Sequence, residues 1–203
     1  MTPHILLIGG ASGVGKTALA QRLARELDAS HLLVDDVRIA LQAATTPAQL
    51  PALHFFLTND PHELSVEAFV AGLIALADLL QPALRQIIEH HLAVPAAGRL
   101  VIEGDGIAPT LLAALLPGMR SNAADDRVRG VFIVEPDEAR LLANFRARDR
   151  GFGTLDAAQQ NHYAQAAWHY NGWLMAEAQR HNLPMLAAQP YETLMARVLG
   201  MFE

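Results

Sequence analysis

The chemically most distinctive pattern in the chain is G-x-x-x-x-G-K-[ST], which residues 10–17 satisfy with the letters GASGVGKT. Its glycines allow a tight turn with inward-pointing backbone N–H groups, and a helix opening at Lys16 adds the positive end of its dipole. The Lys16 ammonium can reach terminal phosphates, and the Thr17 hydroxyl can contact Mg²⁺. Lys16 is also the only lysine among 15 basic residues. We predict a nucleotide-binding loop made of Gly10, Ala11, Ser12, Gly13, Val14, Gly15, Lys16, Thr17 and Ala18.

A second candidate site follows the apolar run Leu32–Val34, where the chain reads Asp35-Asp36-Val37-Arg38. A carboxylate at this strand end can orient an attacking hydroxyl or accept its proton. Asp36 is the better placed of the two to cap the following helix, so Asp35 is the candidate base. Arg38, one turn into the helix, can bind an anionic acceptor. The alternative is that both aspartates only cap the helix.

A third group of candidates follows the apolar residues 100–102 and consists of Glu103-Gly104-Asp105-Gly106. An acid directly after an apolar strand suits a magnesium site in which the carboxylate acts through water. We therefore expect Thr17 and Glu103 to hold the metal and Glu103 and Asp105 to face the acceptor. The alternative is a tight turn that uses Gly and Asp for their backbone conformations.

Arginines gather on the predicted helix Pro136–Arg150, where the four-residue spacing puts Arg146 and Arg150 on one face. The glycines that follow, in residues 151–153, supply the flexible break of a closing lid. Lid arginines stabilise charge on a transferring phosphoryl group. The alternative is a solvated face paired with nearby carboxylates.

The remaining pattern alternates short apolar strands with amphipathic helices. We predict strands at 4–8, 32–34, 100–102, 131–134 and 185–187, and helices at 16–28, from 36 through 41, and at 65–93, 136–150, 155–181 and 192–199. Near-continuous apolar strands separated by helices are typical of a parallel sheet covered on both faces. Ligands of such sheets bind at the carboxyl ends of the strands.

Composition limits the classes of function. The 203 residues are 52% hydrophobic and carry a net charge of −6, which excludes global disorder and disfavours a nucleic-acid or membrane-surface binder. The chain has no cysteine, so disulfides and thiolate chemistry are excluded. No signal-sequence pattern stands at the N-terminus, and we expect one cytoplasmic domain over residues 1–203.

Four segments together resemble the P-loop small-molecule kinases of the nucleoside- and nucleotide-kinase group, and most closely the 2-phosphoglycerate-kinase-like members. These segments are residues 9–17, 35–38, 101–109 and the arginine-bearing helix. The resemblance implies a three-layer α/β/α P-loop fold with a five-stranded parallel sheet of order 2-3-1-4-5 and a lid at about 137–160. It also implies ATP and Mg²⁺ as donor, a small hydroxyl- or phosphate-bearing acceptor, and catalytic roles for Lys16, Asp35, Arg146 and Arg150.

The chain departs from that family at Asp105, where related sequences tend to carry a histidine after Glu-Gly. The family also implies that residues 189–191 contact adenine. Two other classes of function remain open from the residues alone. One is a P-loop ATPase that acts as a nucleotide-dependent switch on a protein partner, and the other is a kinase acting on a nucleic-acid end.

Overall fold

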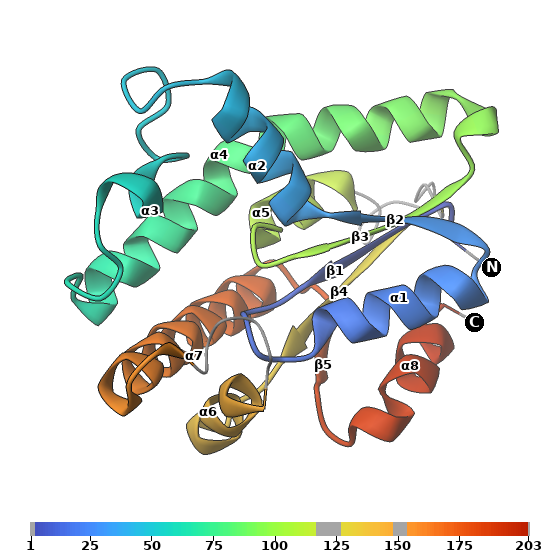
Figure 1. Cartoon of the computed structure of the whole chain (residues 1–203). Coiled ribbons are helices and arrows are strands. Elements are labelled where there is room, and N and C mark those ends of the chain that lie inside the picture. Colours follow the sequence, from blue (N-terminus) through green and yellow to red (C-terminus); the bar gives the residue numbers. More distant parts are fainter. Residues whose placement is uncertain (1–2, 117–126, 148–153, 203) are drawn as a thin grey trace.

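The computed structural model describes residues 3–116, 127–147 and 154–202. Its centre is a parallel five-stranded sheet whose strands lie in the order β2-β3-β1-β4-β5, as the resemblance implied (Figure 1). All neighbouring strands are parallel. The strands are β1 (Ile5–Gly9), β2 (Ala29–Leu33), β3 (Arg99–Gly104), β4 (Val128–Val134) and β5 (Met185–Ala187).

Helices cover both faces of the sheet, which gives three layers (Figure 1). On one face Ile5 and Leu7 of β1 pack in a core with α4, α5 and the C-terminal part of α7, and on the other Leu6 and Ile8 pack with α1, α6 and α8. The helices are α1 (Lys16–Glu26), α2 (Val34–Ala44), α3 (Phe55–Thr58), α4 (Val66–Ala93), α5 (Pro109–Leu115), α6 (Glu138–Arg146), α7 (Ala157–Arg180) and α8 (Tyr191–Gly200), with a 3₁₀ turn at Pro95–Ala97.

The start of α2 corrects one prediction. β2 ends at Leu33 and α2 begins at Val34, so Asp35 and Asp36 both lie in its first turn. The residue at the N-cap is Leu33, and no side chain caps the helix. The prediction that Asp36 caps the helix is therefore wrong. Both carboxylates instead lie near the positive end of the helix dipole, where negative charge is favourable.

Three other helices differ from the predicted pattern. α6 begins at Glu138 rather than at Pro136, because Asp137 serves as its N-cap and accepts a hydrogen bond from the Arg140 backbone N–H at 3.2 Å. The short helices α3 and α5 were not predicted from the sequence. α5 begins at Pro109, a residue type well suited to a first helical turn.

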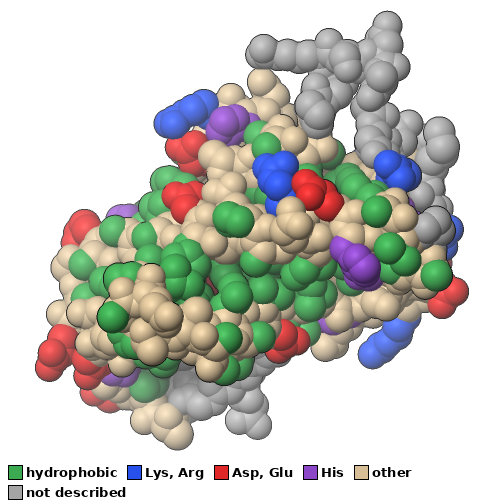
Figure 2. Space-filling model, turned by 90° about the horizontal axis from the view of Figure 1, so that it is seen from above, with side chains coloured by type: hydrophobic (Ala, Val, Ile, Leu, Met, Phe, Trp, Pro, Cys, Tyr) green, Lys and Arg blue, Asp and Glu red, His purple; other side chains and the backbone are tan. Residues whose placement is uncertain are grey.

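α4 is the longest apolar element, and its N-cap is Ser65, whose hydroxyl oxygen accepts a hydrogen bond from Ala68 N. By length and composition alone it could cross a membrane. In the fold, Leu80, Leu84 and Ile88 of α4 pack in the core with Ile5 and Leu7 of β1. Figure 2, viewed from the side of α2 and α4, shows that hydrophobic side chains also remain visible on this outer face between scattered charges.

Candidate active site

The phosphate loop connects β1 to α1 and has the backbone that the glycines predict. Gly10, Gly13 and Gly15 have φ values of +142°, +92° and +86°, and the last two lie in or near the left-handed region that glycine adopts without strain. Lys16 is 7% exposed, and its Nζ donates a hydrogen bond to the Ala11 carbonyl at 2.8 Å. The ammonium group therefore lies folded across the loop at the N-terminus of α1, where an anion would bind.

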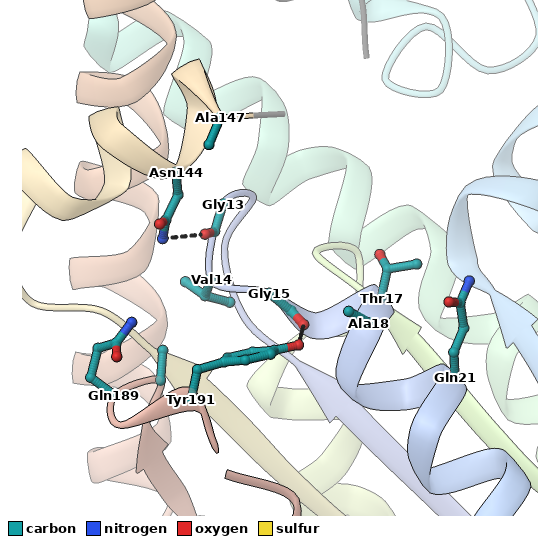
Figure 3. Close-up of a pocket in the computed structure, with 11 residues that line it drawn as sticks. Gly13, Val14, Gly15, Thr17, Ala18, Gln21, Asn144, Ala147, Gln189 and Tyr191 are labelled. Carbon is teal, nitrogen blue, oxygen red and sulfur yellow. Dashed lines mark hydrogen bonds between the residues drawn. The ribbon is translucent and has the colours of Figure 1, made fainter. Parts of the chain in front are cut away.

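Two side chains from distant parts of the chain fix the outward carbonyls of this loop. Asn144 Nδ2 of α6 donates to Gly13 O at 2.9 Å, and the Tyr191 hydroxyl of α8 donates to Gly15 O at 3.0 Å (Figure 3). A Cβ on Gly15 would lie 2.7 Å from the Tyr191 ring, so the ring touches the backbone. Burial raises the pKa of Tyr191 above its ordinary value. Asn144 and Tyr191, which both line the cavity beside the loop, thus tie α6 and the start of α8 to the loop backbone.

A cavity of about 630 Å³ opens beside the loop. Figure 3 shows Gln189 and Tyr191 on one wall and Asn144 and Ala147 on another. Gln189 and Tyr191, which the family resemblance predicts to contact adenine, thus line the same cavity as the phosphate loop. The cavity is lined by Gly13, Val14, Gly15, Thr17, Ala18, Gln21, Asn144, Ala147, Ala188, Gln189 and Tyr191.

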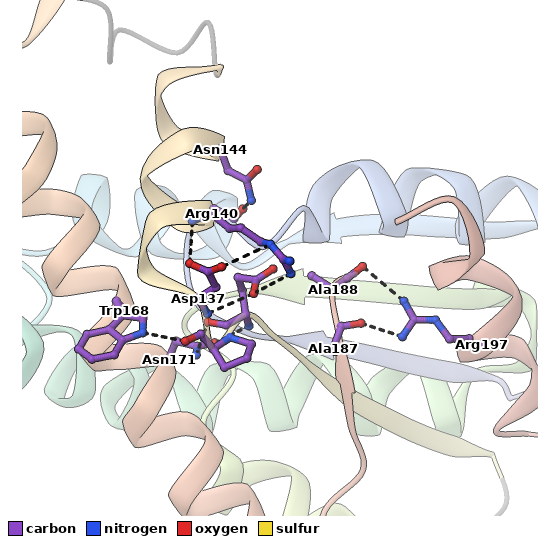
Figure 4. Close-up of polar contacts among 11 residues, drawn as sticks. Asp137, Arg140, Asn144, Trp168, Asn171, Ala187, Ala188 and Arg197 are labelled. Atoms are coloured by element: carbon purple, nitrogen blue, oxygen red, sulfur yellow. Dashed lines mark hydrogen bonds and ion pairs between the residues drawn. The ribbon is translucent and has the colours of Figure 1, made fainter. Parts of the chain in front are cut away.

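Arg197 supports the turn that forms one wall of this cavity. Its Nη1 donates to Ala187 O at 2.8 Å, and its Nη2 donates to Ala188 O at 3.4 Å (Figure 4). The same Nη2 also donates to Pro190 O at 2.9 Å. One guanidinium group from α8 thus binds carbonyls on both sides of Gln189. The sequence analysis did not find this role, because an arginine in a short amphipathic helix carries no pattern that points to it.

On the opposite side of the loop, the carboxyl end of β3 brings two acids close to it. Glu103 pairs in register with Leu33 of β2 and Ile8 of β1 and is 4% exposed. No hydrogen bond to its carboxylate is found among the described residues. Asp105 lies against the loop itself, because Ser12 Oγ donates to Asp105 Oδ2 at 3.0 Å.

The glycines beside Asp105 allow close packing of the turn that carries it. A Cβ on Gly104 would lie 2.9 Å from Val34 Cγ2, and a Cβ on Gly106 would lie 2.9 Å from Leu80 Cδ1 and Val34 Cγ1. α2 and α4 therefore press directly on this turn. The contact with Val34 also places Asp35, the next residue, beside the same strand ends.

Asp35 and Arg38 form a pair on the first turn of α2. Arg38 Nε and Nη2 both lie 3.1 Å from Asp35 Oδ1, and Arg38 Nη1 donates to Gln42 Oε1 at 3.1 Å. The Asp35 side chain is 60% exposed. The structure thus brings these two predicted residues together, with the guanidinium group of Arg38 bound within its own helix.

Two adjacent buried residues of α7 brace the strands on either side of β1. The Tyr170 hydroxyl donates to the backbone carbonyl of Asp105 at 2.7 Å, after β3. The Asn171 amide binds both the N–H and the carbonyl of Glu135, after β4, at 3.1 and 2.9 Å. Tyr170 and Asn171 are each 1% exposed. The sequence analysis singled out neither residue, and the signal that could have found them is a polar Asn171 within an otherwise apolar helical face.

Glu135 is a buried acid that the sequence analysis also missed. It is 1% exposed, and its Oε1 accepts from Asp137 N at 3.2 Å and lies 3.9 Å from Arg140 Nη1. Figure 4 shows Arg140 and Asp137 meeting at the start of α6. Glu135 therefore holds the first turn of this helix to the end of β4.

The predicted lid arginines are only partly described. Arg146 lies exposed at the C-terminal end of α6. Arg150 lies outside the described residues, as do residues 148–153 of the predicted lid. Within the described ranges, no group of three or more His, Cys, Asp or Glu side chains could hold a metal ion.

A parallel sheet of order 2-3-1-4-5 with a glycine-rich phosphate loop between β1 and α1 is the architecture of the P-loop kinases, and this chain has that fold. No family model matches the chain. A 2-phosphoglycerate kinase from Pyrococcus horikoshii is 32% identical over 120 residues, which cover 51% of this chain and 39% of that protein. The matched part is thus well under half of the relative's length.

Solved structures agree with this fold. A shikimate kinase from Bacteroides thetaiotaomicron has a TM-score of 0.55 with 18% identity over 97% of each chain. A gluconokinase from Sinorhizobium meliloti has a TM-score of 0.50 with 13% identity, over 99% of this chain and 92% of its own. All three similar proteins are kinases by name, and the two structures establish the likeness of fold.

Proposed function

We propose that this protein is an ATP- and Mg²⁺-dependent kinase that transfers the γ-phosphoryl group to a hydroxyl or phosphate group of a small molecule. The proposal depends on one observation: the phosphate loop lies between a cavity and a group of carboxylates. A cavity of about 630 Å³ lies on one side, and the carboxylates that follow β2 and β3 lie on the other. Direct transfer requires a donor and an acceptor that meet at one place.

The nucleotide occupies the cavity and the loop in this proposal. Its base lies between Asn144 and the turn that carries Gln189 and Tyr191, all of which line the cavity. Its phosphates lie over the backbone N–H groups of residues 10–18, with the Lys16 ammonium on the terminal phosphates. The buried position of Lys16 supports this role, because a buried ammonium group is stable when it meets an anion.

The residues present fit a magnesium ion that arrives with the phosphates. Mg²⁺ keeps several waters and needs few protein ligands when phosphates supply oxygens. The Thr17 hydroxyl lines the cavity, and the Glu103 carboxylate is buried with no hydrogen-bond partner among the described residues. Thr17 would hold the ion directly and Glu103 through water. When bound, Mg²⁺ neutralises negative charge on the β- and γ-phosphates.

The acceptor binds at the ends of β2 and β3, beside Asp35, Arg38, Glu103 and Asp105. Its hydroxyl oxygen bonds to the γ-phosphorus while the bond to the bridging oxygen breaks, and the electron pair of that bond stays on ADP. The hydroxyl proton passes to Asp35. Arg146 and Arg150, on a lid at about 137–160, stabilise the charge in transit. We expect this reaction in the cytoplasm, with no nucleic acid or membrane involved.

Nucleotide titration followed by an acceptor screen tests the proposal. Calorimetry with ATP and GTP, with and without Mg²⁺, should show magnesium-dependent binding of ATP. ADP release is then measured against a panel of phosphorylated acids, nucleosides, sugars and antibiotics, and at least one compound should accelerate it. ATP hydrolysis that responds only to a protein partner would support the ATPase switch instead. Failure to bind either nucleotide would refute both.

A further inference from the structure

Arg197 of α8 binds three backbone carbonyls of the turn that follows β5. Its guanidinium group donates to Ala187 O at 2.8 Å and to Ala188 O at 3.4 Å (Figure 4). It also donates at 2.9 Å to Pro190 O, which accepts a second hydrogen bond from Thr193 Oγ1 at 3.2 Å. One side chain therefore holds the backbone on both sides of residue 189.

Gln189 itself keeps its hydrogen-bonding groups available. The Ala188 N–H before it donates to Val134 O at 2.8 Å, and Pro190 after it has no N–H. In the described parts of the chain, no hydrogen bond is found for the backbone N–H, the backbone carbonyl or the side-chain amide of Gln189. Gln189 is exposed and lines the cavity beside the phosphate loop. Its donors and acceptors can therefore serve a molecule in that cavity.

The chemistry of the cavity indicates which part of a nucleotide Gln189 meets. The described residues that line the cavity are all uncharged, so they suit hydrogen bonds and apolar contacts rather than charge pairing. The phosphates lie instead on the loop, where the Lys16 ammonium and the N-terminus of α1 favour anions. The wall that carries Gln189 therefore suits the uncharged base.

The turn around Gln189 is fixed at both ends. Ala188 is held by Arg197, and Tyr191 is held by its hydrogen bond to the phosphate loop at 3.0 Å. Among the described residues, Arg197 is the side chain that binds carbonyls both before and after Gln189. Groups that are already fixed bind a ligand more tightly than mobile ones, because less order has to be imposed on binding. Loss of the guanidinium group would leave three carbonyls without this donor and would loosen the turn.

On the basis of the proposed kinase function, we infer that Arg197 is a positioning residue for the nucleotide base. It acts through Gln189 and the backbone beside it, because Arg197 is not among the described residues that line the cavity. Removal of its guanidinium group should therefore weaken the binding of a ligand that carries a base. The binding of a phosphate chain without a base should stay nearly unchanged.

Two ligands with the same number of phosphates test the inference, namely ATP and inorganic tripolyphosphate, each with Mg²⁺. Their dissociation constants are measured by calorimetry on the full chain and, where binding is weak, by the rise in Tm with ligand concentration. Arg197→Met keeps an apolar stem and removes the guanidinium group. It should weaken ATP binding about tenfold or more, while the dissociation constant of tripolyphosphate changes by less than about twofold.

A second variant, Arg197→Lys, separates hydrogen-bond geometry from charge. An ammonium group keeps the positive charge but lacks the planar fork of donors, so this variant should also weaken ATP binding, by about threefold or more. Arg180→Met is the matched control, because Arg180 of α7 has a side chain that is 70% exposed and pairs with Glu177 at 2.8 Å. It should change neither dissociation constant by more than about twofold.

The outcomes separate the inference from the proposed function. If the wild-type protein does not bind ATP, the proposed function fails and the inference fails with it. If it binds ATP, then unchanged ATP binding in Arg197→Met, an equal loss of both ligands, or full ATP binding in Arg197→Lys overturns the inference alone. If Arg197→Met does not fold, the two ligands are compared on Arg197→Lys, where ATP binding must again fall more than tripolyphosphate binding.

Discussion

Replacement of Lys16 by methionine removes one charge from the phosphate loop while keeping a side chain of similar length. The Lys16 Nζ lies 2.8 Å from Ala11 O and is surrounded by protein, so a phosphate oxygen that joins it replaces little water. Two unit charges about 4 Å apart at an effective dielectric constant of about 20 interact by about 4 kcal/mol. If that interaction is formed mainly in the transition state, its loss corresponds to about a 10³-fold fall in turnover.

The same change should have little effect on folding. Lys16→Met loses a hydrogen bond to the Ala11 carbonyl, but it also removes the desolvation cost of a buried ammonium group. We expect a Tm within about 5 °C of the wild type, since about 1 kcal/mol shifts the Tm of a chain this long by roughly 2–4 °C.

ADP release at saturating Mg²⁺ and ATP, calorimetric nucleotide binding and thermal melting measure the three quantities on one preparation. Arg25→Ala, which removes an exposed charge from the same helix, should change none of them by more than about twofold in rate or 0.5 kcal/mol in stability. A Lys16→Met protein that keeps its turnover within tenfold, or that loses it only because it unfolds, would refute the reasoning.

Two further predictions concern α7. Asn171→Ala removes the side-chain partners of the buried N–H and carbonyl of Glu135, so it should lower the Tm by roughly 5–15 °C. The control is Asn161→Ala, at an exposed position of the same helix, which should leave the Tm unchanged. Equal melting temperatures of the two variants would contradict this prediction. Because burial keeps the pKa of Tyr170 well above 10.0, the folded state holds a proton that the unfolded state loses, and stability should fall as pH rises above about 10. Tyr170→Phe should reduce that fall by up to about 1.4 kcal/mol per pH unit, measured by melting between pH 8 and 11.5, and an unchanged slope would exclude Tyr170 as its source.

Local patterns predicted the fold well where the signal was contained in a few neighbouring residues. β5 was predicted at its observed bounds, Met185–Ala187, because Asn182 and Pro184 before it and Pro190 after it delimit a short apolar run. The junction of β2 and α2 was predicted less well, because the strand was expected to end at Val34, which is the first residue of α2. Leu32, Leu33 and Val34 are all apolar, and the helix begins at Val34 where it packs against Gly104 and Gly106. That contact spans 70 residues, so the sequence near Val34 does not contain it.

In the candidate site too, the sequence predicted the features formed by neighbouring residues and missed those formed by distant ones. The motif predicted the turn of residues 10–17 and the position of Lys16, since the pattern and the geometry belong to the same few residues. The contacts of Tyr191 with Gly15 and of Tyr170 with Asp105 join residues 176 and 65 positions apart. In each contact a tyrosine hydroxyl donates to a backbone carbonyl. Every residue has such a carbonyl, so the sequence does not indicate which one is the acceptor. Such contacts become visible only when the strands are placed in their order.

The turn after β3 has a consequence for how proteins with this fold can change their substrates. The space on either side of Asp105 is filled, by Val34 beside Gly104 and by Leu80 beside Gly106, so a larger residue at either glycine would force two helices apart. The Asp105 side chain differs from these glycines, because it is only half-buried and accepts a hydrogen bond from Ser12 Oγ. If the acceptor binds beside Asp105 as proposed, exchange of this single side chain alters which molecules are accepted while the glycines on either side keep the turn packed between α2 and α4, and a new specificity can arise in one mutational step.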